Sequence, residues 1–371
     1  MDSLLQNSQS EVRIDGKIDI RGLTFEKLSA LIEDVGEKSF RAKQIFDWLH
    51  NKRVCDFDGM NNVPKNLRDK LEEKTDIYTV EIADRLISKE DGTRKYLHKL
   101  KDGNIIETVL LRYDYGNSIC VSSQVGCRMG CRFCASTLDG LVRNLSAGEM
   151  ASQIYSVERD LGERIGHVVV MGSGEPLDNY DNFVDFVRII TDERGANISK
   201  RNITASTCGI VPNIRRLADE KIPLTLALSL HAVTDEKRRQ IMPVAYKYSL
   251  EEVFAACSYY FEQTGRRITC EYSLIAGQND AGEDVMGLID IARRLKCHIN
   301  LIPVNPIKER NYRATASQAV LALKNKLEKN KINVTIRREM GRDINGACGQ
   351  LRRSYLMDDE GPNVILGEEN A

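Results

Sequence analysis

Three cysteines stand close together in the sequence, Cys127, Cys131 and Cys134, with the spacing C-x3-C-x2-C. Thiolates at such short spacing are typical ligands of zinc and of iron–sulfur clusters. A closed site of either kind takes four protein ligands, and this loop supplies three. The spacing therefore favours an iron–sulfur cluster in which one iron stays open to a substrate or cofactor.

The alternative is a zinc site that takes its fourth ligand from a distant residue, for which His98, His167 and His298 are candidates. Zinc motifs usually combine two short-spaced pairs of ligands, and the chain contains no second C-x2-4-C pair. The cluster is therefore the favoured interpretation. Its spacing also resembles the signature of radical S-adenosylmethionine (SAM) enzymes, in which a 4Fe-4S cluster binds the methionine end of SAM at the open iron.

Length, charge and cysteine content limit the possible classes of protein. With 371 residues, the chain can form one large α/β domain and a smaller one. A formal net charge of −1 excludes a protein coated in basic charge, so any nucleic-acid contact must come from local patches. The chain has ten cysteines but no apolar leader in its first residues, which does not fit a secreted protein with a disulfide framework. No apolar run is long enough to span a bilayer. We therefore expect a cytoplasmic protein without a membrane segment.

The N-terminal part of the sequence has short helical patterns. Residues 1–17 are polar and aperiodic, and we expect them to be flexible. After them Leu28 and Ile32 share one helical face, which predicts a small helical domain over residues 18–79. Residues 38–70 contain eight Lys or Arg against four Asp, with aromatic residues between them. This stretch could bind RNA through its phosphates, or it could be an ordinary solvated helix face.

The rest of the chain predicts an α/β fold. Residues 80–112 form β-type runs separated by the turn signals Asp91-Gly92 and Asp102-Gly103, which indicates a small sheet that links two domains. Over residues 113–346, about six βα units predict a parallel sheet with helices outside. A partial, TIM-like (β/α)6 barrel fits best, and a doubly wound sheet would give a similar pattern. The expected strands are 167–171, 202–206, 224–231, 268–275, 297–304 and 332–337, and the expected helices are 146–161, 210–220, 249–265, 282–295 and 317–330. Ser146 with Glu149 and Ser249 with Glu252 form capping-box patterns at the start of two of these helices.

Polar and glycine residues follow the expected strands. Gly174 would let a ligand approach the backbone, and Glu175 offers a carboxylate to an ammonium group. Ligands of parallel βα folds collect at the carboxyl ends of the strands, so these residues could together hold the methionine, ribose and adenine of SAM. Taken singly, each could equally be an ordinary turn or a structural group. The other members of this set are Ser206, Ser229, Leu230, His231 and Asn305.

Two further cysteines differ in their surroundings. Cys348 lies in a polar, glycine-rich segment that is typical of a mobile loop with an exposed thiol. The arginines around it would lower the pKa of the thiol and attract phosphates. Cys120 precedes the first loop cysteine by seven residues, and the sequence is equally compatible with a packing role for it. We assign five other cysteines to the core: Cys55, Cys208, Cys257, Cys270 and Cys297.

Together these motifs resemble the RlmN family of RNA methyltransferases over residues 18–355. Members of that family methylate carbon 2 of adenine in 23S rRNA and in tRNA, next to the anticodon. The sister family, Cfr, methylates carbon 8 of the same ribosomal adenine and tends to have Gly-Glu-Ala-Leu where this chain has Pro176, so this residue favours carbon 2. The motifs that carry the resemblance are Cys120, the three-cysteine loop, Gly174-Glu175-Pro176-Leu177, Ser229-Leu230-His231-Ala232, Ile241-Met242-Pro243 and Ala347-Cys348-Gly349-Gln350-Leu351.

The resemblance implies a role for each reactive residue. The cysteine loop would hold one 4Fe-4S cluster, and one SAM molecule would methylate Cys348. A second SAM, cleaved at the cluster, would produce the radical that takes hydrogen from this methyl group. The resulting methylene radical would add to carbon 2 of adenine, and Cys120 would resolve the protein–RNA crosslink by forming a disulfide with Cys348. Glu107 matches the proton acceptor of the family.

The resemblance also implies an electron donor and a role for the C-terminal segment. It predicts a low-potential electron donor such as flavodoxin or ferredoxin, and we expect a monomer. Residues 347–371 would form the loop with the catalytic cysteine and an acidic tail. Two rival hypotheses are a radical SAM activase, which makes a glycyl radical on a partner protein and needs no Cys120/Cys348 pair, and an iron–sulfur RNA-binding or sensor protein that cleaves no SAM.

Overall fold

The computed structural model describes residues 13–14, 16–347 and 349–351. Residues 1–17, which we expected to be flexible, lie largely outside these ranges, and so does the acidic tail. Cys348 also lies outside the described residues. Among the described residues, no helix is long and apolar enough to cross a bilayer.

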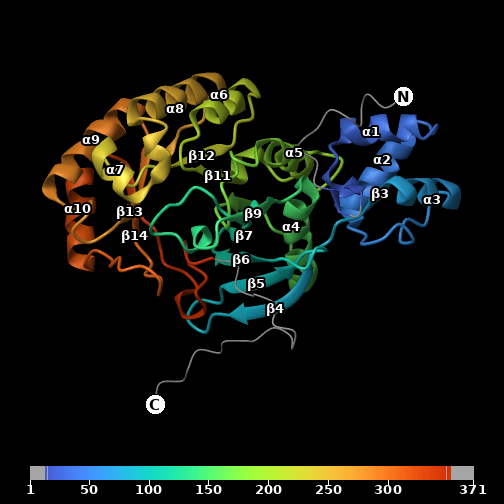
Figure 1. Cartoon of the computed structure of the whole chain (residues 1–371), viewed down its shortest axis with the longest axis horizontal. Helices are drawn as coiled ribbons and strands as arrows, with labels where there is room; N and C mark the ends of the chain where they lie inside the picture. Colours follow the sequence, from blue (N-terminus) through green and yellow to red (C-terminus); the bar gives the residue numbers. More distant parts are fainter. Residues whose placement is uncertain (1–12, 15, 348, 352–371) are drawn as a thin grey trace, which may run out of the picture.

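A ten-stranded mixed sheet forms the centre of the described structure (Figure 1). Its order is β15-β14-β13-β12-β11-β10-β7-β6-β5-β4. The strands from β7 to β15 in this order pair in parallel and form the partial barrel, which confirms the predicted α/β class. The parallel strands are β7 (Gly116–Cys120), β10 (His167–Val170), β11 (Ile203–Thr207), β12 (Thr225–Ser229), β13 (Thr269–Leu274), β14 (His298–Pro303) and β15 (Val334–Ile336).

The β-type runs before the barrel do not form a separate linking sheet. Instead, β4 (Glu81–Ile87), β5 (Arg94–Lys99) and β6 (Ile105–Tyr113) pair antiparallel and continue the barrel sheet through β7. The predicted turns at Asp91-Gly92 and Asp102-Gly103 join these strands, which confirms the two turn signals. Strand periodicity shows which side chains share a face, but it does not show which strand edges pair, so the sequence could not reveal this continuity.

Helices cover the outer face of the parallel strands, and α6, α8, α9 and α10 lie side by side along one edge of the molecule (Figure 1). The predicted capping boxes at Ser146 and Ser249 are present. The short helix α7 was missed, because its sequence DEKRRQI is almost entirely polar. The barrel helices are α4 (Ala147–Leu161), α5 (Tyr180–Thr191), α6 (Val211–Asp219), α7 (Asp235–Ile241), α8 (Leu250–Thr264), α9 (Gly282–Leu295) and α10 (Ser317–Lys329).

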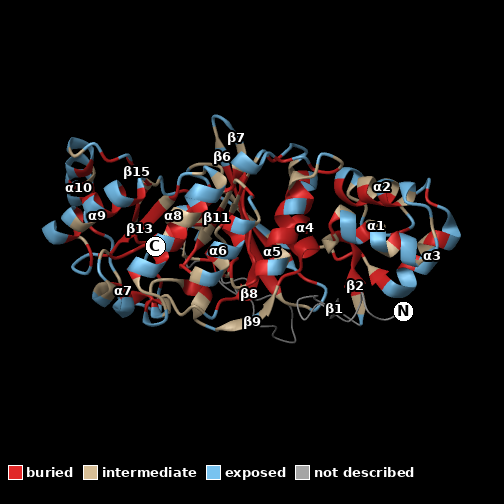
Figure 2. Cartoon of the chain, turned by 90° about the horizontal axis from the view of Figure 1, so that it is seen from above, coloured by how far each residue is buried: buried red, intermediate tan, exposed pale blue. Residues whose placement is uncertain are grey.

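Three N-terminal helices pack around a core of their own at one end of the molecule (Figures 1 and 2). Leu28 and Ile32 are fully buried in that core, as their periodicity predicted. Ser39 precedes a helix but makes no side-chain cap, and Pro64 lies one residue before the third helix. The elements are β1 (Arg13–Ile14), β2 (Lys17–Asp19), α1 (Phe25–Asp34), α2 (Phe40–Asp47), α3 (Lys65–Lys74) and β3 (Thr75–Asp76).

A buried polar network joins these N-terminal elements to α4. Asp19 Oδ2 accepts a hydrogen bond from Ser146 Oγ at 2.6 Å, and Asp19 Oδ1 accepts from the backbone N–H groups of Arg21 and Tyr78. The Arg21 guanidinium donates to Ser152 Oγ at 2.8 Å. Burial raises the pKa of Asp19 to about 7, against the opposing effect of the Ser146 hydrogen bond. Because buried polar groups are costly when unpaired, the network fixes how the two parts of the chain meet.

Two serine substitutions test this network. Ser146 and Ser249 both cap a helix, but only Ser146 also donates to buried Asp19. We expect Ser249→Ala to lower the free energy of unfolding by about 1 kcal/mol through loss of the cap. Ser146→Ala should cost about 2–3 kcal/mol, since Asp19 loses a donor as well. Urea unfolding followed by circular dichroism measures both values, and equal losses would contradict a joining role for Ser146.

Candidate active site

A pocket of about 130 Å³ lies at the carboxyl ends of the parallel strands. The structure brings most of the predicted site residues together there, although they come from widely separated parts of the chain. Leu230 is different: it is fully buried, and its backbone N–H donates to Glu271 O rather than facing the pocket. The predicted residues that line the pocket are Cys127, Cys131, Cys134, Gly174, Glu175, Ser206, Ser229, His231 and Asn305.

The cysteine loop is anchored at both ends by backbone hydrogen bonds. Cys127 N donates to Gly140 O at 2.9 Å, between β8 (Gln124–Gly126) and β9 (Leu141–Asn144). Further along the loop, Arg132 N donates to Ile241 O at the end of α7, also at 2.9 Å. A side chain at residue 126, where φ is +75°, would place its Cβ 2.0 Å from Gly140 O. Only glycine therefore allows the approach that sets the first cysteine in place.

The three thiols of the loop line one pocket, and two of them are poorly hydrated. Burial raises the pKa of Cys127 to about 12 and that of Cys131 well above its usual value. Metal binding displaces the thiol protons. In the described part of the chain, no three His, Cys, Asp or Glu side chains converge on one point as ligands of a single ion do. Three thiols on the wall of one pocket are the donors that a 4Fe-4S cluster would take from the protein if one iron stayed open, so the residues present fit such a cluster.

The three histidines considered as zinc ligands have partners on other elements. His98 Nδ1 lies 3.0 Å from Thr108 Oγ1, and His298 Nε2 lies 2.9 Å from Thr335 Oγ1. The ring of His167 packs edge-on against Tyr115. The pocket with the cysteine loop contains His231 instead. The described structure thus gives the zinc alternative no support from these candidates.

Glu175 is held rigidly in the turn after β10. Its Oε2 accepts from Cys208 N at 2.7 Å, and its Oε1 accepts from Leu177 N at 3.1 Å. Burial raises the pKa of Glu175, whereas these N–H donors lower it. Gly174 has φ +108°, and a Cβ there would lie 2.6 Å from Ser123 Oγ. The close approach at Gly174 places Glu175 in the pocket wall, and the two N–H donors fix the orientation of its carboxylate.

His231 is a buried, neutral histidine in the left-handed backbone region, with φ +55°. Its Nδ1 accepts from Ser273 N at 2.9 Å, and its ring packs edge-on against Phe133 of the cysteine loop. Burial lowers its pKa to about 3. His231 therefore stays uncharged at neutral pH and supports the loop and the pocket wall without adding charge.

Sequence reasoning missed Arg238, which ties the strand ends together from behind the pocket. This fully buried guanidinium donates to Cys208 O at 2.6 Å, to Ser229 O at 3.1 Å and to Leu230 O at 3.2 Å. An arginine between Lys237 and Arg239 in a charged heptapeptide gives no sequence signal of burial. Two of the core cysteine assignments change as well: Cys208 is buried but lines the pocket, and Cys55 is exposed, so its core assignment was wrong.

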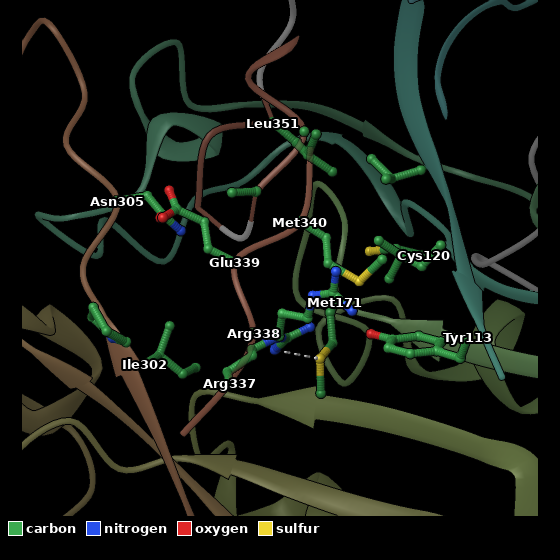
Figure 3. Close-up of a pocket in the computed structure, with 15 residues that line it drawn as sticks. Tyr113, Cys120, Met171, Ile302, Asn305, Arg337, Arg338, Glu339, Met340 and Leu351 are labelled. Atoms are coloured by element: carbon green, nitrogen blue, oxygen red, sulfur yellow. Dashed lines mark hydrogen bonds between the residues drawn. The ribbon is translucent and has the colours of Figure 1, made fainter. Parts of the chain in front are cut away.

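A second pocket adjoins the first, and Figure 3 shows its lining residues. Both pockets share Met171, Ile302, Asn305 and Arg337. Cys120 lies on the wall of the second pocket near Met340, which belongs to the C-terminal segment (Figure 3). Cys120 is therefore buried, as a packing role would require, and it also faces a cavity next to the cysteine-loop pocket.

The chain neighbours of Cys348 contact both pockets. Ala347 lines the second pocket, and Gly349 lines the first. Gly349 O accepts from Ala135 N at 2.8 Å, which ties this segment to the residue after the last loop cysteine. Glu107 lines neither pocket; it is buried on β6, 3.3 Å from Lys95 Nζ.

This fold and site define a radical SAM enzyme. Residues 121–289 match the model of the Radical SAM superfamily, and residues 18–77 match that of the ribosomal RNA large subunit methyltransferase N-terminal domain. A solved radical SAM methyltransferase from Sphaerobacter thermophilus superposes with a TM-score of 0.85 and 39% identity. The match covers 90% of this chain and 99% of that one.

Two similar proteins specify the family. "Probable dual-specificity RNA methyltransferase RlmN" of Lachnoclostridium phytofermentans is 57% identical, over 92% of this chain and 96% of its own length. The protein of the same name from Clostridium perfringens strain 13 is 54% identical, over 91% and 97%. The chain belongs to the RlmN family of radical SAM RNA methyltransferases, which confirms the resemblance found in the sequence.

Two glycine substitutions test the anchor of the cysteine loop. We expect Gly126→Ala to displace Cys127, because the added Cβ would collide with Gly140 O. Gly140→Ala is the control: its φ is +70°, but its Cβ would meet nothing within 4 Å. Both carry a backbone cost of ~1–3 kcal/mol, and only the first adds the collision. Iron and sulfide assays after anaerobic reconstitution should show a larger loss for Gly126→Ala, and equal occupancy would contradict the anchor.

Proposed function

We propose that this protein methylates carbon 2 of adenine in 23S rRNA and, next to the anticodon, in tRNA, with the methyl group carried by Cys348. One observation carries the proposal: Ala347 and Gly349, on either side of Cys348, contact the pocket of Cys120 and the pocket of the cysteine loop, respectively. The names of the relatives, dual-specificity RNA methyltransferase, support the substrate class and favour carbon 2 over the carbon 8 reaction of Cfr.

The first pocket supplies the proposed cofactor site. The three loop cysteines would hold one 4Fe-4S cluster, and Glu175 would bind the ammonium group of SAM. When bound, the cluster would donate and take back single electrons, and SAM would supply the carbon-centred radical that takes a hydrogen atom from the methyl group on Cys348. The remaining proposed SAM contacts are Gly174, Ser206, Ser229, Leu230, His231 and Asn305.

The protein's own residues carry the later steps. Carbon 2 of adenine is not nucleophilic, so a radical must form the new carbon–carbon bond. The methylene radical on Cys348 adds to carbon 2, and the adduct then loses one electron and the carbon 2 proton, which Glu107 accepts. The Cys120 thiolate attacks the sulfur of Cys348, forming a disulfide and breaking the bond from sulfur to methylene. The released carbon takes up a proton and becomes the methyl group.

Further partners follow from this reaction. We propose that residues 18–79 contact the RNA; exposed Lys38, Phe40 and Lys43 at the start of α2 support this, because they offer charge to phosphates and a ring for stacking. Each radical needs an electron from a low-potential donor such as flavodoxin or ferredoxin. We further propose that the enzyme works as a monomer in the reducing cytoplasm, where cysteine thiols are kept reduced.

Replacing Cys120 tests the covalent scheme. Cys120→Ala should leave formation of the protein–RNA bond intact and block its resolution, so that a covalent adduct accumulates during anaerobic turnover with a 23S rRNA fragment. Denaturing gels and mass spectrometry measure the adduct. Cys55→Ala removes an exposed cysteine and is the matched control. Absence of an adduct, or an adduct that persists when Cys348 is also replaced by Ala, would refute the scheme.

Replacing Glu175 tests the SAM site. Glu175→Gln keeps the shape and loses the charge, and its single amide oxygen can replace only one of the two carboxylate oxygens that accept from Cys208 N and Leu177 N. We expect SAM affinity to fall by roughly 10- to 100-fold, the value of a hydrogen bond to a charged partner. Equilibrium binding to the reconstituted protein measures it, with Asp181→Asn on the outer helix α5 as control. Unchanged affinity would exclude Glu175 from the site.

A further inference from the structure

Four side chains share one face of the sheet beside the second pocket. Lys95 on β5 pairs with Val109 on β6, and Val109 pairs with Cys120 on β7. Directly paired residues of antiparallel strands point to the same face. Glu107 lies two residues before Val109 and therefore projects from this face as well. The proposed resolving thiol and the proposed proton acceptor thus share a surface with a lysine to which sequence reasoning gave no role.

Lys95 is buried and contacts two different parts of the chain. Its side chain is 9% exposed, and its Nζ lies 3.3 Å from Glu107 Oε1. The same ammonium donates to Asn345 O at 3.4 Å, three residues before Cys348. An ammonium has three hydrogen-bond donors, so it can serve both oxygens at once. Burying such a charge is costly unless it is paired, which makes this position unusual for a lysine without a role.

The segment before Cys348 is docked on the turn between β4 and β5. Gly341 N donates to Asp91 Oδ2 at 2.9 Å, and Lys89 N donates to Asp343 Oδ2 at 2.9 Å. Gly341 has φ +65°, and a Cβ there would lie 2.8 Å from Thr93 Cγ2. These contacts hold the beginning of the segment. The contact from Lys95 holds its end, next to Glu107.

We propose that Lys95 is a positioning residue for the resolution of the protein–RNA bond. Its ammonium holds the Glu107 carboxylate in a fixed position relative to the backbone of Asn345, three residues before Cys348, so that the base and the carrier cysteine act on the same adduct. The inference rests on the proposed function, and it assigns Lys95 to the steps after the carbon–carbon bond has formed.

Two substitutions separate charge from bulk. Lys95→Met keeps a long side chain without the ammonium, and Lys95→Arg keeps the charge. In single-turnover reactions of the reconstituted full-length protein with SAM, reductant and a 23S rRNA fragment, we expect Lys95→Met to accumulate the covalent adduct. The rate at which this variant releases methylated RNA should fall by at least about tenfold. Lys95→Arg should recover most of the rate. Lys99→Met is the control, because Lys99 is exposed on the same strand.

The possible outcomes separate the role of Lys95 from the proposed covalent scheme on which it rests. If Cys120→Ala accumulates adduct while Lys95→Met resolves it at the wild-type rate, only the role of Lys95 is refuted. If Cys120→Ala forms no adduct, the covalent scheme itself fails. Iron content and circular dichroism show whether each variant is folded. Should Lys95→Met unfold, Lys95→Gln replaces it, and a neutral variant that resolves the adduct as fast as Lys95→Arg would overturn the proposal.

Discussion

The double pairing of β7 is the constraint on which the rest of the structure depends. Along one edge this strand pairs antiparallel with β6, and along the other it pairs parallel with β10. Its last residue, Cys120, is in register with Val109 on one side and with Val169 on the other. A shift of one residue in either pairing would turn Cys120 to the opposite face of the sheet. The antiparallel strands and the barrel are therefore one unit, and their junction sets the position of the Cys120 thiol.

The cysteine loop depends on neighbours that supply backbone contacts rather than side-chain chemistry. Gly140 O and Ile241 O hold its two ends. Through Arg238, helix α7 also holds the carbonyl ends of β11 and β12, which carry other residues of the pocket wall. One short helix thus fixes the loop and the strand ends relative to each other. Such a supporting layer lets a pocket keep its geometry before any cofactor binds.

Sequence reasoning predicted local features and ligand types better than edges and burial. The capping boxes at Ser146 and Ser249 were correct because they depend on four consecutive residues. The strand-end set was predicted because parallel strands bring their carboxyl ends to one edge of the sheet. The joining of β6 to the barrel, the burial of Arg238 and the exposure of Cys55 were missed. Each depends on contacts between residues far apart in the chain, and hydrophobic periodicity does not encode these contacts.

The two reactive cysteines of the proposed scheme have opposite requirements. A thiol that only attacks a sulfur can be fixed, and Cys120 lies buried at the end of a central strand. A residue that carries a methyl group from one partner to the next must reach several positions, which an irregular segment allows and a strand does not. The segment before Cys348 starts from firm contacts on the β4–β5 turn. In the proposed scheme, this docking gives β4 and β5 a part in positioning the carrier, although neither strand contributes a residue to the cofactor pocket.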